Sequence, residues 1–226
     1  MKLFVYGYRP YDEEEAFRRY AEQFDVTVGL CEEQPSMDNA ALAEGYDAIS
    51  IVSTEMPQQL IVRFRALGIR MISTRTVGYD HIDLNTAKTV GIHVSNATYS
   101  PCGVADYTVM LILMALRRCK RILQRADIHD FTLPGIIGRE LRSCTVGVLG
   151  TGKIGRTVLE DLSGFGCRRL AYSRTPDPSL GVEYVSLDEI LARSDVLTFH
   201  MPLNEASYHL IDHAAIAKMK DGVVLV

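Results

Sequence analysis

Short apolar runs rich in β-branched residues alternate with helical patterns along almost the whole chain. Strands are predicted in the first half at residues 3–6, 26–30, 48–52, 71–73 and 92–94. Strands are predicted in the second half at residues 145–149, 169–172, 196–199 and 223–226. Helices between successive strands are typical of parallel sheets. The pattern therefore predicts an α/β protein with two doubly wound parallel-sheet domains, a flavodoxin-like N-terminal domain and a Rossmann domain.

Local signals indicate where several helices begin. Asp12 is placed to cap the first helix, in which apolar residues recur at helical spacing. A late helix is predicted at residues 187–192, where Ser186 and Glu189 have the spacing of a capping box. A further helix over residues 154–165 follows a glycine-rich turn.

The most apolar stretch predicts one long, buried helix over residues 103–123. Its apolar core is shorter than the roughly 20 residues that a membrane span needs. We place the domain boundary beside this helix, giving domains 1–100 and 101–226. The first residues are interpreted as a strand rather than a signal peptide. The sequence stops within its last predicted strand, which favours an incomplete second domain.

Composition narrows the classes of function. The chain has 226 residues, of which 47% are hydrophobic, so it can bury a substantial core. A formal net charge of −4 with 23% charged residues indicates neither a nucleic-acid-binding nor a disordered protein. The five cysteines are scattered and form no metal-ligand cluster, which favours reduced thiols in a cytoplasmic protein without a metal site. Small molecules are the expected partners.

The most informative motif is the glycine turn GTGKIG at residues 150–155, which follows a predicted strand and opens a helix. Gly150 permits the tight turn, and Gly152 lets the backbone approach a pyrophosphate. Gly155 allows close packing of the helix against the strand. The free N–H groups at the helix start would face the phosphates. This context predicts a dinucleotide site, whereas a purely structural turn is the alternative.

The end of the next strand bears on which nicotinamide cofactor binds. NAD-specific sites carry an acidic residue there, which binds the adenosine ribose, but this chain has Ser173 followed by Arg174. Ser173 removes a carboxylate that would repel a 2′-phosphate, and Arg174 offers a cation. We therefore expect NADP(H) in preference to NAD(H). NAD(H) is the alternative if Arg174 is only a solvated loop residue.

Several motifs together resemble the D-isomer-specific 2-hydroxyacid dehydrogenases. They are residues 74–83 (TRTVGYDHID), 99–101 (YSP), 104–107 (VADY), the glycine turn and 200–203 (HMPL). The resemblance covers essentially the whole chain. It looks closest to D-lactate dehydrogenases of the vancomycin-resistance type, which implies reduction of pyruvate to D-lactate with NADPH. D-2-hydroxyisocaproate-type activity is an alternative, as is a non-catalytic redox-sensing module that binds NAD(P).

The resemblance also implies which residues bind the ligands. Backbone N–H groups of Val77 and Gly78 would hold the substrate carboxylate in a cleft between the domains, which Tyr99 would also line. The cofactor-binding residues implied by the turn and the resemblance are Gly150, Gly152, Lys153, Ile154, Gly155, Ser173, Arg174, Met201, Pro202 and Ser207. His200 is interpreted as a structural residue beside the cofactor rather than as the proton donor.

No catalytic residue is assigned within the chain. The resemblance places the family's catalytic arginine, glutamate and histidine after Val226, so residues 1–226 are expected to bind ligands but to be inactive alone. The resemblance further implies a homodimer formed through the apolar helix at residues 104–116. The alternative is a monomer in which this helix is buried between domains.

Overall fold

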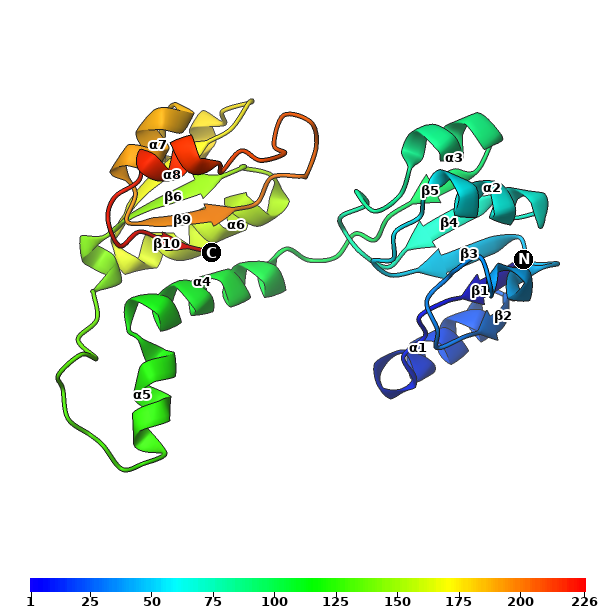
Figure 1. Cartoon of the computed structure of the whole chain (residues 1–226), viewed down its shortest axis with the longest axis horizontal. Helices are drawn as coiled ribbons and strands as arrows, with labels where there is room; N and C mark the ends of the chain where they lie inside the picture. The colour runs from blue at the N-terminus through cyan, green and yellow to red at the C-terminus, as the bar shows by residue number, and fades with distance from the viewer. The chain divides into compact units, whose positions relative to one another are not determined.

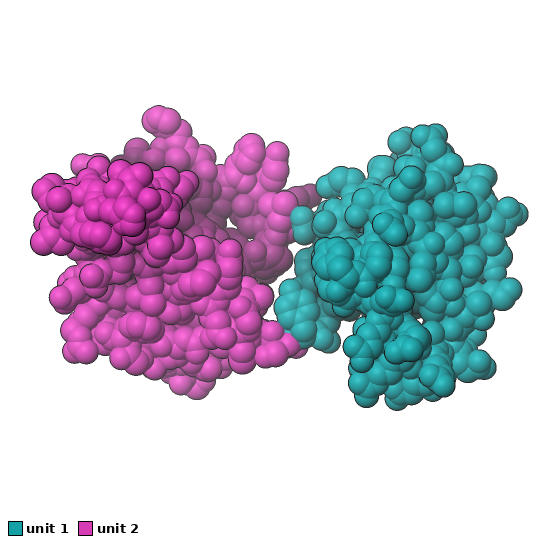
Figure 2. All heavy atoms as spheres, turned by 90° about the horizontal axis from the view of Figure 1, so that it is seen from below, with its two compact units in different colours: residues 1–99 teal, residues 100–226 magenta.

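The computed structural model describes residues 1–226, which form two compact units, Met1–Tyr99 (unit 1) and Ser100–Val226 (unit 2) (Figures 1 and 2). Each unit contains one five-stranded sheet in which all pairs of neighbouring strands are parallel. The expectation of two parallel-sheet α/β units is confirmed.

Unit 1 has the strand order β2-β1-β3-β4-β5, which is that of flavodoxin-like folds. Its strands are β1 (Lys2–Val5), β2 (Thr27–Leu30), β3 (Ala48–Ile51), β4 (Met71–Thr74) and β5 (His93–Ser95). Its helices are α1 (Pro10–Gln23), the 3₁₀ turn η1 (Ala40–Ala43), α2 (Gln58–Ala66) and α3 (Leu84–Val90). The central strand β3 is fully buried, as expected of an apolar strand covered on both faces.

Unit 2 has the strand order β10-β9-β6-β7-β8. Its strands are β6 (Thr145–Leu149), β7 (Arg168–Tyr172), β8 (Glu183–Tyr184), β9 (Val196–Phe199) and β10 (Val224–Leu225). Counted from β6, this is the order 3-2-1-4-5 of the Rossmann fold. The direction of strand succession reverses between β6 and β9, so the loops that follow these two strands lie at the switch point where ligands bind.

Helices cover both faces of the second sheet (Figure 1). The helices of unit 2 are α4 (Cys102–Leu116), α5 (Cys119–Ala126), α6 (Lys153–Asp161), α7 (Leu187–Arg193) and α8 (His213–Ala217). Short 3₁₀ turns are η2 (Leu141–Ser143), η3 (Leu162–Phe165) and η4 (Pro178–Leu180). Apolar residues of α4 and α6 form one core with the sheet, and those of α7 and α8 form a second core. The sheet is therefore a buried central layer.

The predicted start of the first helix needs correction. Asp12 does not cap α1, because the helix begins at Pro10 and Asp12 lies in its first turn. Proline is suited to that first position, where its missing N–H costs nothing. The capping box of Ser186 and Glu189, in contrast, is confirmed at the start of α7. Asp83 also caps α3 by accepting a hydrogen bond from the Thr86 N–H at 2.9 Å.

The predicted long helix is in fact two helices, α4 and α5. Arg118 interrupts them with a left-handed backbone (φ +53°), and its side chain donates to the Gly135 carbonyl at 3.0 Å. The α4 helix is also only partly buried, because Tyr107 is 59% exposed and Met110 41% exposed. No helix has the length and apolar character needed to span a membrane. None of the five cysteines forms a disulfide.

Candidate functional site

The glycine turn lies at the switch point of unit 2, where β6 leads into α6. Gly150 has a left-handed backbone (φ +92°), and a Cβ there would lie 2.8 Å from the backbone carbon and oxygen of His200. A Cβ at Gly155 would overlap the carbonyl oxygen of Gly150. Both glycines therefore let the turn pack closely against its neighbours, as expected from the sequence.

Gly152 differs from these two glycines because no atom lies within 4 Å of the position that its Cβ would occupy. It is the N-cap of α6, and its backbone is one that any residue can adopt (φ −69°). The fold itself therefore does not require glycine here. Open space at this position fits the predicted close approach of a phosphate group.

The start of α6 presents unpaired hydrogen-bond donors. The N–H groups of Gly152, Lys153 and Ile154 donate to no acceptor in the chain, whereas the N–H of Arg156 donates to the Gly152 carbonyl at 2.9 Å. Lys153 is exposed and takes part in no ion pair. Donors, helix dipole and lysine thus favour an anion at this point.

A cavity of about 290 Å³ opens at this switch point. Its lining joins the glycine turn, the end of β7 and the loop after β9. The lining residues are Gly150, Thr151, Gly152, Tyr172, Ser173, Arg174, Thr175, His200, Met201, Pro202, Asn204, Ala206, Ser207 and Leu210. Seven predicted cofactor residues therefore share one cavity, namely Gly150, Gly152, Ser173, Arg174, Met201, Pro202 and Ser207. Lys153, Ile154 and Gly155 do not line it but lie in the adjoining first turn of α6.

The wall at the end of β7 contains no carboxylate. Ser173 is half-buried, and its hydroxyl accepts from the Thr175 N–H at 3.3 Å. Arg174 is exposed and forms no ion pair with any acidic residue of the chain. This wall can therefore accept a negatively charged group without displacing an internal partner of Arg174.

The opposite wall is the loop after β9. Ser207 donates from its hydroxyl to the Pro202 carbonyl at 2.7 Å, and that hydroxyl accepts from the Asn204 N–H at 2.8 Å. Hydrogen bonds of the Ser207 side chain within the loop thus fix the loop's conformation. Asn204 was not predicted as a site residue, because an asparagine after a strand is equally typical of an ordinary turn.

His200 also lines the cavity. Its Nε2 lies 2.9 Å from the Thr198 hydroxyl, and burial holds the pKa of the imidazole below its ordinary value. A lowered pKa leaves this ring neutral near pH 7, which fits the structural interpretation better than the role of proton donor.

The second predicted site is the loop after β4 in unit 1. Val77 is half-buried and Gly78 is exposed, and neither of their N–H groups donates to an acceptor in the chain. Their carbonyls, in contrast, are both engaged. Asn96 Nδ2 donates to the Val77 oxygen at 2.7 Å, and the Thr76 hydroxyl donates to the Gly78 oxygen at 2.6 Å. Tyr99 is exposed and forms no hydrogen bond with this loop.

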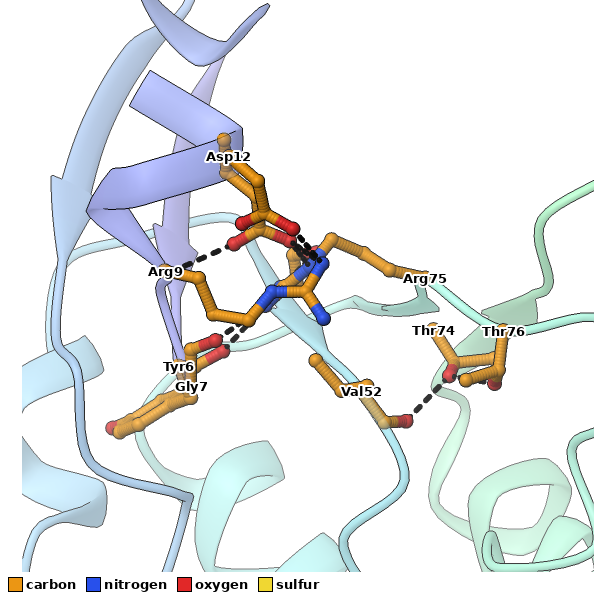
Figure 3. A network of polar contacts seen from close by, with 10 residues as sticks. Tyr6, Gly7, Arg9, Asp12, Val52, Thr74, Arg75 and Thr76 are labelled. Carbon is orange, nitrogen blue, oxygen red and sulfur yellow. Dashed lines mark hydrogen bonds and ion pairs between the residues drawn. The ribbon is translucent and has the colours of Figure 1, made fainter. Parts of the chain in front are cut away.

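Arg75, which precedes this loop, is the centre of a polar network (Figure 3). Its guanidinium donates to the carbonyls of Tyr6 and Gly7 at 3.1 and 2.8 Å. It also donates to the Ser50 hydroxyl and to the Glu13 carboxylate, both at 3.0 Å. One side chain therefore ties together the ends of β1 and β3, the start of α1 and the loop after β4.

No role in the site was predicted for Arg75, Thr76 or Asn96. Each is a polar residue next to a strand end, and such residues are usually solvated. Only the parallel pairing of β4 with β5 brings Asn96 beside Val77, and only the order of β1, β3 and β4 gives Arg75 its acceptors.

The strand order and the glycine turn define unit 2 as a Rossmann-type dinucleotide-binding unit. Residues 109–226 match the family model described as the NAD binding domain of D-isomer specific 2-hydroxyacid dehydrogenases. The chain belongs to the D-isomer-specific 2-hydroxyacid dehydrogenase family, which confirms the resemblance found in the sequence.

Individual relatives agree with this assignment. A D-specific alpha-keto acid dehydrogenase of Enterococcus faecium is 43% identical over 98% of this chain and 68% of its own length. An aromatic 2-oxoacid reductase of Clostridium sporogenes is 39% identical over the whole chain and 70% of its own length. Among solved structures, the D-lactate dehydrogenase of Aquifex aeolicus complexed with NAD and lactic acid superposes with a TM-score of 0.90 at 31% identity. That match covers 99% of this chain and 67% of the Aquifex chain.

Proposed function

We propose that the chain is the ligand-binding part of a D-2-hydroxyacid dehydrogenase, an oxidoreductase that reduces a small 2-keto acid with a nicotinamide cofactor. The observation that carries this proposal is the glycine turn, where free N–H groups, open space at Gly152 and a cavity lie together. Family membership adds the reaction class.

In this proposal the two units have different roles. Residues 101–226 bind the dinucleotide, with the pyrophosphate at the N–H groups of Gly152, Lys153 and Ile154. Ser173 and Arg174 lie toward the adenosine ribose, and Met201, Pro202 and Ser207 form the wall after β9. Residues 1–100 bind the keto acid, with its carboxylate at the N–H groups of Val77 and Gly78 and with Tyr99 as a lining residue. When bound, the reduced nicotinamide supplies the hydride for the keto carbon.

The preference for NADP(H) rests on Ser173 and Arg174 alone. A relative that superposes closely is complexed with NAD, and the matched family model is that of an NAD binding domain. We therefore propose that the chain binds NAD(H) and that the free cation at Arg174 also admits the 2′-phosphate of NADP(H). The ratio of the dissociation constants for NADH and NADPH shows which of the two cofactors the chain prefers.

Pyruvate is the first choice of substrate, and a larger keto acid such as 2-ketoisocaproate is the alternative. The Clostridium relative, an aromatic 2-oxoacid reductase, gives a reason to include phenylpyruvate in any comparison. Because the resemblance assigns the catalytic arginine, glutamate and histidine to positions after Val226, residues 1–226 are proposed to bind without turning over.

Assembly and location are further parts of the proposal. The exposed apolar residues of α4, including Tyr107, Met110 and Met114, support a homodimer formed through this helix. Five unpaired cysteines are in keeping with a reducing compartment such as the cytoplasm.

The test is a titration of the chain with NADH and with NADPH, followed by fluorescence of the reduced nicotinamide. Saturable binding of at least one cofactor is expected, with competition by the oxidised form. Pyruvate, 2-ketoisocaproate and phenylpyruvate are then added to the complex in turn. Failure of both cofactors to bind the folded chain would contradict the proposal.

A further inference from the structure

The loop after β4 has an unusual division of its backbone groups. The carbonyls of Val77 and Gly78 are each bound by a side chain, and the N–H groups of the same residues are free. Here two side chains select which kind of group the loop presents.

Two independent contacts produce this selection. The Asn96 side chain, on the segment after β5, donates to the Val77 oxygen at 2.7 Å. The Thr76 hydroxyl donates to the Gly78 oxygen at 2.6 Å and lies 2.6 Å from the Thr74 hydroxyl. The backbone adds a third link, because the Ala97 N–H donates to the Thr76 carbonyl at 3.0 Å.

The Thr76 hydroxyl lies beside a buried side chain, Thr74. Thr74 is buried, and its hydroxyl donates to the Val52 carbonyl at 2.7 Å (Figure 3). The ring of the buried His81 lies 3.2 Å from the same hydroxyl through Nε2. Because the single proton of Thr74 goes to Val52 and that of Thr76 goes to Gly78, the contact between the two hydroxyls is a packing contact, which places Thr76 beside a buried part of the sheet.

We propose that Thr76 and Asn96 are positioning residues for the substrate carboxylate. They hold the carbonyl oxygens of Val77 and Gly78 away from the anion and leave the two N–H groups to bind it. The inference rests on the proposed function, because it assumes that this loop binds a 2-keto acid. It deepens that function by assigning the anion selectivity of the loop to two side chains that do not themselves touch the substrate.

The physical reason is the opposite sign of the two ends of a peptide dipole. A carbonyl oxygen that turned toward a carboxylate would repel it, and a mobile loop would sample such orientations. Binding both oxygens removes those states before the ligand arrives, so less ordering is needed on binding. The loss of one contact should therefore weaken carboxylate binding without changing the ligand's own contacts.

The variants are Thr76→Val, which removes the hydroxyl at nearly constant shape, and Asn96→Ala. Thr76→Ser keeps the hydroxyl and should rescue. Thr89→Val is the matched control, because the exposed Thr89 hydroxyl donates to the Asn85 carbonyl at 2.8 Å within α3 and not to the loop after β4. NADH affinity should be the same in all four variants, because unit 2 is unchanged.

Two readouts are measured by nuclear magnetic resonance on the whole chain. The first is the order parameter of the Val77 and Gly78 amides without ligand. It reports directly whether the contacts of Asn96 and Thr76 restrain the loop. The second is the shift of the same amides during titration with pyruvate, with uncharged methyl pyruvate as the ligand control. We expect Thr76→Val and Asn96→Ala to lower the amide order and to weaken pyruvate binding about fivefold each, the factor that corresponds to one ordinary hydrogen bond.

The outcomes separate the inference from the proposed function. If the amide order falls in both variants but pyruvate never shifts the wild-type amides, Thr76 and Asn96 do restrain the loop. The assignment of the loop to substrate binding is then wrong. If amide order and pyruvate affinity are both unchanged, the positioning role is overturned. If affinity falls while the amide order stays the same, the two side chains touch the ligand, which also overturns it.

Discussion

Arg156 Nη2 lies 2.6 Å from Asp177 Oδ2, so the first turn of α6 is joined to the segment that follows β7. The two segments that flank the cavity at Gly152 and Ser173 are thereby linked by residues that do not line it. The same carboxylate accepts hydrogen bonds from the Ser179 hydroxyl at 2.6 Å and the Ser179 N–H at 2.9 Å.

These contacts predict an acid dependence of stability. Hydrogen bonds from Ser179, followed by those from Arg156, lower the pKa of Asp177 from 3.8 to about 2. A depressed pKa means that the stabilisation is complete above the ordinary value and is lost as the pH falls from about 4 to about 2. Asp177→Asn should therefore make unfolding of unit 2 less dependent on pH in this window.

The measurement is urea unfolding at several pH values, followed by far-ultraviolet circular dichroism because the chain has no tryptophan. Asp221→Asn is the control, since Asp221 is exposed and takes part in no ion pair or side-chain hydrogen bond. Equal pH dependence in both variants would contradict the role of Asp177.

Gly152 and Gly150 should respond differently to alanine. The added Cβ of Gly152→Ala has no atom of the chain within 4 Å, so stability should be retained. Cofactor affinity should fall about tenfold, because the methyl group occupies space that the pyrophosphate needs. Gly150→Ala forces a left-handed backbone on alanine and brings its Cβ to 2.8 Å from His200, so it should cost roughly 2 kcal/mol of stability. Thermal unfolding and NADH titration of both variants test the contrast. Undiminished binding by a folded Gly152→Ala chain would remove the pyrophosphate assignment.

Ser173→Asp should shift the cofactor preference toward NADH. A carboxylate roughly 4 Å from a 2′-phosphate would repel it by about 4 kcal/mol per unit charge at an effective dielectric of 20, and solvent reduces this at a half-exposed site. A shift of at least about tenfold in the ratio of the two dissociation constants is expected. Ser163→Asp, on the exposed turn after α6, adds the same charge away from the cavity and should leave the ratio unchanged.

Arg75 should matter far more to stability than Arg70. Arg75 is 17% exposed and pairs with Glu13, which is 11% exposed, whereas Arg70 is 68% exposed and pairs with Asp47. Removing one member of a buried pair costs about 3 kcal/mol, while an exposed pair contributes about 0.5 kcal/mol. Arg75→Met should therefore destabilise unit 1 strongly and Arg70→Met hardly at all. Similar unfolding midpoints for the two variants would show that the Arg75 network is not a structural centre.

Much of the fold could be predicted because buried parallel strands leave a strong apolar signal. The runs at 145–149 and 196–199 coincide with β6 and β9, and the capping box before α7 is present. The break at Arg118 was not predicted. The apolar run ends at Leu116 and a mostly basic stretch follows at residues 117–121, but neither glycine nor proline marks the break, and the left-handed residue is an arginine.

The candidate site divides in the same way. The glycine turn is local, so its residues could be named from one stretch of sequence. The cavity wall at Ser173 could be inferred because it follows a strand end, and the wall at Pro202 from the family resemblance. The Asn96 contact joins segments that follow different strands, whereas the Thr76 hydroxyl bonds to Gly78 two residues away, and an isolated threonine or asparagine carries no sign of such a partner.

Asn96 has one more property that follows from its place in the chain. It lies on the segment that leaves β5 and crosses from unit 1 into unit 2 after Tyr99. The segment whose Asn96 side chain binds the Val77 carbonyl is therefore also the covalent connection between the two units. Asn96 and Ala97 bond to Val77 and Thr76, so a change in the backbone at this connection is expected to reach the loop after β4, and the proposed binding of a carboxylate there should depend on it.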